Sequence, residues 1–193
     1  GDRIGLAPVD TTVPDGLDHY HGRSTRPGDG DGVRVAVIDS GVGPHPDILT
    51  ASALNTVRGE ARSLGADNGS GHGTHIAGII AARGTAPGGL RGIAPAAELL
   101  SWRVYDAARN PATNYSIIKA LIGAMDAGCH IINLSLGLDP AVATIDLALT
   151  DAIEDANDSG AAVIAAAGNG WQDPVLFPAR LDQVVGVSAV GRR

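Results

Sequence analysis

The chain has 193 residues, a net charge of −7 and one cysteine, Cys129. Its length favours a single domain, its charge argues against a nucleic-acid partner, and a single cysteine excludes an intrachain disulfide. No apolar run approaches the roughly 18 residues that a membrane-spanning helix needs, so no membrane is expected among its partners.

The first 32 residues predict an irregular lead-in to a domain that spans residues 33–193. Three prolines interrupt this segment, and it ends in the run Gly28-Asp29-Gly30-Asp31-Gly32. Glycine and proline at this density favour turns over regular elements.

Residues 33–38 form an almost continuous run of apolar, mostly β-branched side chains. Such a run is typical of a strand that is buried on both faces of a parallel sheet. The run ends at Asp39, whose carboxylate is therefore expected at the carboxyl end of a strand, where open α/β sheets bind their ligands. From Asp39-Ser40-Gly41 alone, a turn aspartate that caps a loop is an equally good interpretation.

The spacing of apolar side chains predicts a helix over residues 72–82, with Asn68 or Ser70 as its cap. Gly73 and Gly78 lie inside this pattern, and each costs about 1 kcal/mol relative to alanine in a helix. We therefore expect another backbone segment, or a ligand, to approach this helix closely.

His72 falls in the first turn of that predicted helix. At this end the helix dipole disfavours an imidazolium, and a neutral imidazole is what a general base requires. A lone histidine is more often structural or simply exposed, so its role depends on the partners that the rest of the chain supplies.

Further elements follow from the hydrophobic pattern. Amphipathic helices are expected at 115–127 and 143–158, and buried strands at 131–134 and 161–167. Cys129 shortly precedes one of these strands, which predicts a buried, inert thiol and not a nucleophile.

Two motifs now stand in the order and spacing of a known family. Val-Ala-Val-Ile-Asp-Ser-Gly at 35–41 and Gly-His-Gly-Thr-His-Ile-Ala-Gly at 71–78 resemble the Asp and His motifs of the subtilisin-like serine peptidases, the subtilases. The resemblance implies that Asp39 holds His72 in one tautomer, and that His72 takes a proton from a serine. His75 belongs to the structural part of the motif.

A third motif, Ala-Ala-Ala-Gly-Asn-Gly at 165–170, resembles the oxyanion-hole segment of the same family. The resemblance implies that Asn169 is the catalytic side-chain donor to the oxyanion, and that Ala167 and Gly168 bind substrate. An amide suits this role because it donates a hydrogen bond without carrying charge. Without the family, an asparagine between glycines is a common turn residue.

Ser135-Leu136-Gly137 resembles the strand edge with which subtilases pair the backbone of a bound substrate. From the residues alone, Ser135 is an ordinary serine at a strand end. The resemblance also puts Leu176 near the floor of the specificity pocket, where prominent members have glycine. A bulky floor predicts a preference for smaller residues before the cut.

The resemblance implies an α/β fold in three layers, with a mostly parallel central sheet and helices on both faces. Residues 98–104 and 184–190 match further strands of the family. The Gly-Thr-Ser-Met-Ala-x-Pro segment, which carries the nucleophilic serine, is absent from these 193 residues. We therefore expect the larger, N-terminal part of a serine endopeptidase domain that uses an Asp-His-Ser triad, with its C-terminal part missing and inactive alone.

The resemblance implies a peptide or protein substrate, allows for a propeptide, requires no cofactor and favours an extracellular location. Pro46-Asp47-Ile48 looks like a turn whose aspartate often binds structural calcium in this family. The loop at 83–91 lacks the asparagine ligands of the best-known members. A turn or capping role is therefore expected for Asp47, and no residue is assigned to a metal.

Two other classes of function stay open. A catalytically inactive subtilase-like module could use the edge at Ser135-Leu136-Gly137 to bind peptides or to regulate a partner. A doubly wound nucleotide-binding domain is disfavoured, because no glycine-rich phosphate loop follows Ile38.

Overall fold

The computed structural model describes residues 7–8, 28–85, 89–138, 147–170 and 174–189. In these ranges the chain builds a six-stranded sheet in the order β3-β5-β2-β6-β7-β8, and every neighbouring pair is parallel. The strands are β2 (Arg34–Asp39), β3 (Thr50–Asn55), β5 (Glu98–Arg103), β6 (Ile131–Leu134), β7 (Ala162–Ala166) and β8 (Val185–Val187). The mostly parallel α/β sheet expected from the sequence is confirmed.

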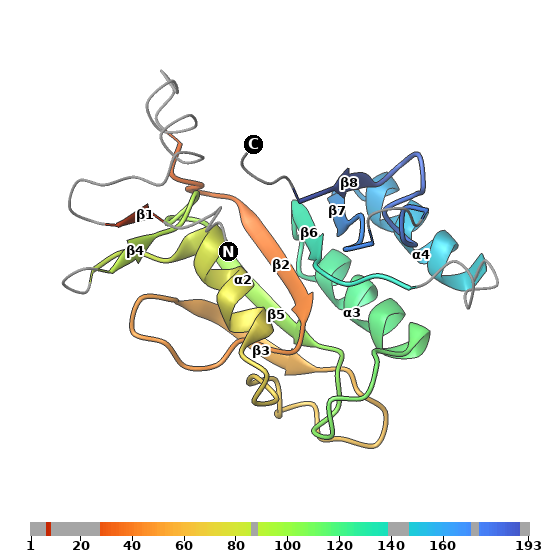
Figure 1. Cartoon of the computed structure of the whole chain (residues 1–193), viewed down its shortest axis with the longest axis horizontal. Coiled ribbons are helices and arrows are strands. Elements are labelled where there is room, and N and C mark those ends of the chain that lie inside the picture. The colour runs from red at the N-terminus through yellow and green to blue at the C-terminus, as the bar shows by residue number, and fades with distance from the viewer. Residues whose placement is uncertain (1–6, 9–27, 86–88, 139–146, 171–173, 190–193) are drawn as a thin grey trace.

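Among the described residues three helices complete the layers: α2 (His72–Ala81), α3 (Asn114–Asp126) and α4 (Leu147–Asp158). Helix α2 packs against β2 on one face of the sheet, whereas α3 and α4 pack together against the other face, beside β6 and β7 (Figure 1). Helices therefore cover both faces, as predicted. Within the described ranges, no helix is long and apolar enough to cross a membrane.

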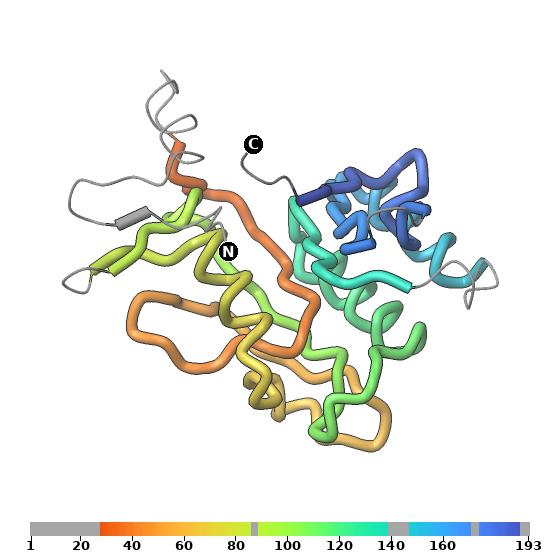
Figure 2. The backbone as a smooth tube through the Cα atoms, in the orientation of Figure 1, coloured from red at the N-terminus to blue at the C-terminus, as the bar shows by residue number. Residues whose placement is uncertain are grey.

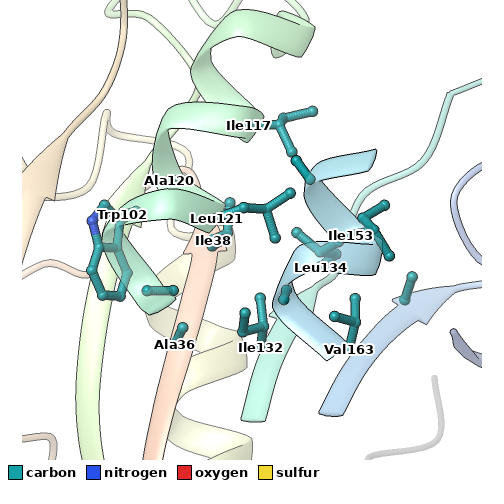
Figure 3. Close-up of a cluster of buried hydrophobic side chains, with 14 of the residues drawn as sticks. Ala36, Ile38, Trp102, Ile117, Ala120, Leu121, Ile132, Leu134, Ile153 and Val163 are labelled. Carbon is teal, nitrogen blue, oxygen red and sulfur yellow. The ribbon is translucent and has the colours of Figure 1, made fainter. Parts of the chain in front are cut away.

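Strand β2 contributes side chains to the hydrophobic clusters on both faces of the sheet. Its side chains alternate, so Val35 and Val37 join the cluster under α2, while Ala36 and Ile38 join the larger cluster under α3 and α4 (Figure 3). Each of these four side chains is at most 4% exposed. Burial on both faces is what the unbroken apolar run predicted.

Helix α3 carries the largest part of the core from the helical side. Ile117 and Leu121 are fully buried on its inner face, and Thr113 and Ser116 form a capping box at its start. At the far end of the helix Cys129 is 6% exposed, and burial raises the pKa of its thiol to about 11. A protonated, buried thiol is inert, which confirms the prediction.

Some elements differ from the sequence-based expectation. Strand β3 was not predicted, because Thr50–Asn55 is a run of small and polar residues that lacks a clear apolar alternation. Two residues of the lead-in, Ala7–Pro8, form β1 and pair with β4 (Leu90–Arg91). The first residues of the helix predicted at 143–158 lie outside the described ranges, and the division at residue 32 stays a prediction.

The sheet is not covered evenly. Val185 and Val187 of β8 are 56% and 53% exposed, although they pair in register with Ile164 and Ala166 of β7. The face of β7 and β8 that carries these valines is therefore open in the described part of the chain, in contrast to both faces of β2.

Candidate active site

The carboxyl end of β2 brings together the two residues that the first two motifs predicted. The side chain of Asp39 is fully buried, and its Oδ1 atom lies 2.7 Å from Nδ1 of His72, the first residue of α2. A carboxylate only accepts hydrogen bonds, so Nδ1 of His72 carries the proton. This leaves Nε2 as the free acceptor on a side chain that is about half exposed, at 53%.

The electrostatics of His72 correct one expectation. Its position at a helix N-terminus predicted a disfavoured cation, but the hydrogen bond that His72 donates to Asp39 raises the pKa of His72 above the ordinary 6.5. Burial acts in the opposite direction, and the charges of Asp39 and Asp67 add to the rise. The contact with a buried carboxylate outweighs the helix end, because the carboxylate stabilises the imidazolium directly.

A second aspartate holds this pair in place, and sequence reasoning did not find it. Ser40 donates a hydrogen bond from Oγ to Oδ2 of Asp67 at 2.9 Å, and the same Oγ accepts one from the backbone N–H of Gly73 at 2.9 Å. The other oxygen of Asp67 accepts from the backbone N–H groups of Gly69 and Gly71. Asp67 thus ties the end of β2 to the start of α2.

Gly73 of α2 is approached closely by another backbone segment, as the sequence predicted. A Cβ atom on Gly73 would lie 2.4 Å from the carbonyl oxygen of Gly41 and 3.2 Å from Cβ of Asp39. The first turn of the helix can approach the end of β2 only without a side chain there. The expected cap is different: the N-cap is Gly71, with φ of 77° and no side-chain hydrogen bond.

Ser135 lies in the same place as the Asp39–His72 pair. These three residues, with Tyr105 and Arg109, line a cleft of about 290 Å³. Oγ of Ser135 accepts a hydrogen bond from the side chain of Asn133 at 2.8 Å. Ser135 therefore lines the same cleft as the two residues of the first two motifs.

Two loops that run side by side (Figure 2) carry Asn68 and Arg109, which line this cleft. Arg109 donates a hydrogen bond to the carbonyl oxygen of Gly69 at 2.7 Å, and the side chain of Asn68 donates to the carbonyl oxygen of Asp106 at 3.0 Å. These bonds join the segment before α2 to the segment after β5. Arg109 was not singled out from the sequence, because nothing local marks it as a cleft residue.

The remaining predicted residues form a second group around Leu176. A Cβ atom on Gly137 would lie 2.7 Å from Cδ1 of Leu176, and one on Gly168 would lie 2.8 Å from its Cγ atom. The N–H of Leu176 also donates to the carbonyl oxygen of Ala167 at 3.0 Å. Leu176 thus packs against both glycines, and its role as a pocket floor stays a prediction.

Leu136 and Asn169 have opposite surroundings. The side chain of Leu136 is 7% exposed and belongs to the core, so only its main chain is available to a substrate. Asn169 follows the end of β7 and is exposed. An exposed amide at the carboxyl end of a parallel strand is free to donate to a ligand.

Asp47 lies in a turn, as expected, but its side chain bonds to a residue 38 positions further along the chain. Its carboxylate is buried and accepts hydrogen bonds from the backbone N–H and the hydroxyl of Thr85. Among the residues that the structure describes, no three His, Cys, Asp or Glu side chains are grouped to hold a metal ion. Calcium binding at Asp47 stays untested.

The carboxyl edge of the parallel sheet thus carries a buried aspartate in contact with a histidine, a pairing that also occurs in the Ser-His-Asp triads of hydrolases. Sequence comparison names the class: the subtilase family model, Peptidase S8, matches residues 30–192, so the chain belongs to this family. Subtilisin Savinase from Lederbergia lenta is 38% identical over 160 residues, covering 83% of this chain and 56% of that protein.

Other relatives agree with this assignment. Alkaline elastase YaB from a Bacillus species is 36% identical over 180 residues, covering 92% of this chain and 45% of the relative. The crystal structure of MycP1 with its N-terminal propeptide removed superimposes with a TM-score of 0.71 at 28% identity, covering 85% of this chain and 58% of that one. The chain spans about half the length of the curated relatives it matches.

Proposed function

We propose that this chain supplies the general base and the oxyanion donor of a serine endopeptidase, and that the nucleophilic serine lies outside these 193 residues. The observation that carries the proposal is the 2.7 Å contact between His72 Nδ1 and the buried Asp39. It fixes the tautomer in which Nε2 can accept the proton of a serine hydroxyl.

The chemistry is acyl transfer from a peptide carbonyl to serine and then to water. His72 takes the serine proton as the acyl-enzyme forms and returns it to the leaving amine, while Asp39 stabilises the transient imidazolium. Asn169 and a backbone N–H hold the negative charge on the carbonyl oxygen. An extended substrate would lie along Ser135-Leu136-Gly137, with the side chain before the cut directed toward Leu176.

Two further observations support the position of the serine. The chain spans 56% of the length of Subtilisin Savinase, and the open face of β7 and β8 exposes two valines. Parallel sheets are usually covered on both faces, so a further part of the domain would fit there. A peptide or protein substrate, a propeptide and an extracellular location belong to the same proposal, which needs neither a cofactor nor calcium.

The test is the intact mass of the purified protein before and after reaction with a fluorophosphonate serine probe. We expect a starting mass above the 19.4 kDa of this chain and one adduct. His72→Ala should abolish labelling, whereas His75→Ala, a histidine three residues further along the same helix, should preserve it. An adduct on the 193-residue chain itself would contradict the proposal, since its nucleophile would then lie among the serines printed here.

The same experiment separates the alternative of an inactive peptide-binding module. That module would give no adduct at any length, and an uncleaved peptide would bind to the edge at Ser135-Leu136-Gly137.

A further inference from the structure

A second cleft lies beside α3, away from the active site, and we call it the lateral cleft. It has a volume of about 370 Å³ and shares none of its lining residues with the cleft at His72. The loop after β3 forms one wall and α3 forms the other, with Trp102 of β5 at the base. This volume is within the range of small-molecule sites in proteins.

Trp102 contributes a hydrogen-bond donor, its indole N–H, to the lining of this cleft. The residue is 2% exposed and lines the cleft. Among the described residues the enclosed side-chain atoms without a hydrogen-bond partner are Asp39 Oδ2 and Ser101 Oγ, so the indole N–H is not an enclosed orphan. Buried tryptophans usually place this N–H where it can find a partner, and a cleft is such a place. The indole nitrogen lies on the side of the ring away from Ile38 and Leu121 (Figure 3).

Gly123 leaves the way to this N–H open. A Cβ atom at this position would lie 2.6 Å from Nε1 of Trp102, and Gly123 itself lines the cleft. Any side chain here would stand against the donor. The pair therefore presents the indole N–H to a molecule that enters the cleft.

Three cationic side chains line the same cleft: Arg58, Arg62 and Lys119, which we call the cationic rim. Within the described ranges none of them forms an ion pair with a carboxylate, although the chain as a whole carries a charge of −7. Arg58 and Lys119 both lie over the ring of Tyr115, at 5.6 and 6.0 Å from its centroid. Two like charges on one ring repel each other, and a bound anion would relieve that repulsion.

The carboxylates of the cleft do not cancel this charge. Glu60 is already engaged, because it accepts hydrogen bonds from Arg103 at 2.7 Å and from Asn55 at 2.9 Å. Asp126 lines the cleft without an ion-pair partner among the described residues, which leaves the cationic rim with an excess of two positive charges.

We propose that the lateral cleft binds a small organic acid, with one carboxylate accepting the hydrogen bond of Trp102 Nε1 and the others held by the cationic rim. Hydrogen bonds from N–H donors to carboxylates are short and strong. The small volume of the cleft favours a small molecule over a folded partner.

The test uses citrate as the probe and the indole N–H signals of the ¹⁵N-labelled chain as the readout. The sequence holds two tryptophans, so Trp171→Phe assigns the signal of Trp102. We expect this signal to shift with citrate in a saturable way, and to stay in place with sodium chloride at equal ionic strength. A shift that sodium chloride reproduces, or no shift at all, would overturn the proposal.

Variants of exposed residues sharpen the result without touching the core. Arg58→Gln combined with Lys119→Gln should weaken citrate binding at least tenfold, whereas Arg180→Gln, an exposed arginine outside the cleft, should leave it unchanged. Asp126→Asn should tighten binding, since it removes a like charge. Unchanged affinity in the double variant, or binding of inorganic phosphate but not citrate, would reject an organic acid as the ligand.

Discussion

The two halves of the sheet differ in how far their faces are covered. The half formed by β3, β5 and β2 is covered on both faces near the site, and its carboxyl end holds Asp39 and His72 in a closed network of hydrogen bonds. The half formed by β6, β7 and β8 is covered by α3 and α4 on one face, while Val185 and Val187 are exposed on the other.

This difference shows which part of a catalytic site can be organised by the chain alone. The Asp39–His72 pair needs only β2, α2 and the loop that carries Asp67, and all three are present. Asn169 and the group around Leu176 lie at the end of the half that is open on one face. We therefore expect the first half to keep its geometry in isolation, and the second half to depend on what covers it.

The largest expected effect concerns the covered half. In a protein that contains the nucleophile, Asp39→Asn should reduce kcat by about 10⁴-fold, because the amide can hold His72 in the wrong tautomer and no longer stabilises the imidazolium. KM should change little, since Asp39 does not touch the substrate. The measurement is steady-state hydrolysis of a peptide, with Asp158→Asn at the exposed end of α4 as the control. A loss below tenfold would rule out the triad role.

The next effect compares the halves directly. In the 193-residue chain, amide hydrogen exchange at β8 should be at least about tenfold faster than at β2, because few buried contacts oppose local opening there. Strand β3 is the matched control, since it is also an edge strand but keeps a half-buried face. Equal exchange in β3 and β8 would assign the difference to edge position and not to the open face.

Sequence reasoning found the features that are local and missed those that depend on distant partners. The burial of β2 and the close approach at Gly73 could be predicted, because each leaves a mark in a few consecutive residues. Asp67 could not, since its partner Ser40 lies 27 positions away and an aspartate among glycines looks like any turn residue. The resemblance predicts a further strand of the family at residues 184–190, and a strand pattern does not say which face is covered.

The residues of the candidate site also differ in how far the sequence could predict them. Asp39 and His72 were paired from two motifs, and the structure brings them into contact. The position at the helix end alone predicts a disfavoured imidazolium, whereas the contact with Asp39 raises the pKa of His72. The roles of Asn169, Ser135 and Leu176 came from the family resemblance and stay predictions, although Leu176 packs against the expected glycines.

A smaller effect is expected at the open half. Leu176→Gly should raise kcat/KM for substrates with Phe before the cut by about tenfold relative to Ala, because the change removes a side chain from the space between Gly137 and Gly168. The measurement is the ratio of kcat/KM for two peptides that differ at this residue. A native protein that already prefers Phe or Tyr would show that Leu176 is not the pocket floor.

The smallest expected effect is the pH dependence that His72 gives to stability and activity. The pKa of His72 is raised above 6.5, so the protonated His72–Asp39 pair stabilises the fold below about pH 6.5, and this contribution is lost as the pH rises through the raised pKa. Activity has the opposite sign, because a general base must be neutral, and the acidic limb of kcat/KM should therefore lie above pH 6.5.

Among the groups that raise the pKa of His72, the charge of Asp67 contributes least. Asp67→Asn should therefore move the acidic limb of kcat/KM slightly toward lower pH, while kcat on the plateau falls only modestly. The amide keeps an oxygen for the N–H groups of Gly69 and Gly71, so the loop should hold. A pH profile that moves toward higher pH, or a plateau loss as large as that of Asp39→Asn, would mean that Asp67 acts on His72 through the position of Ser40 and not through its charge.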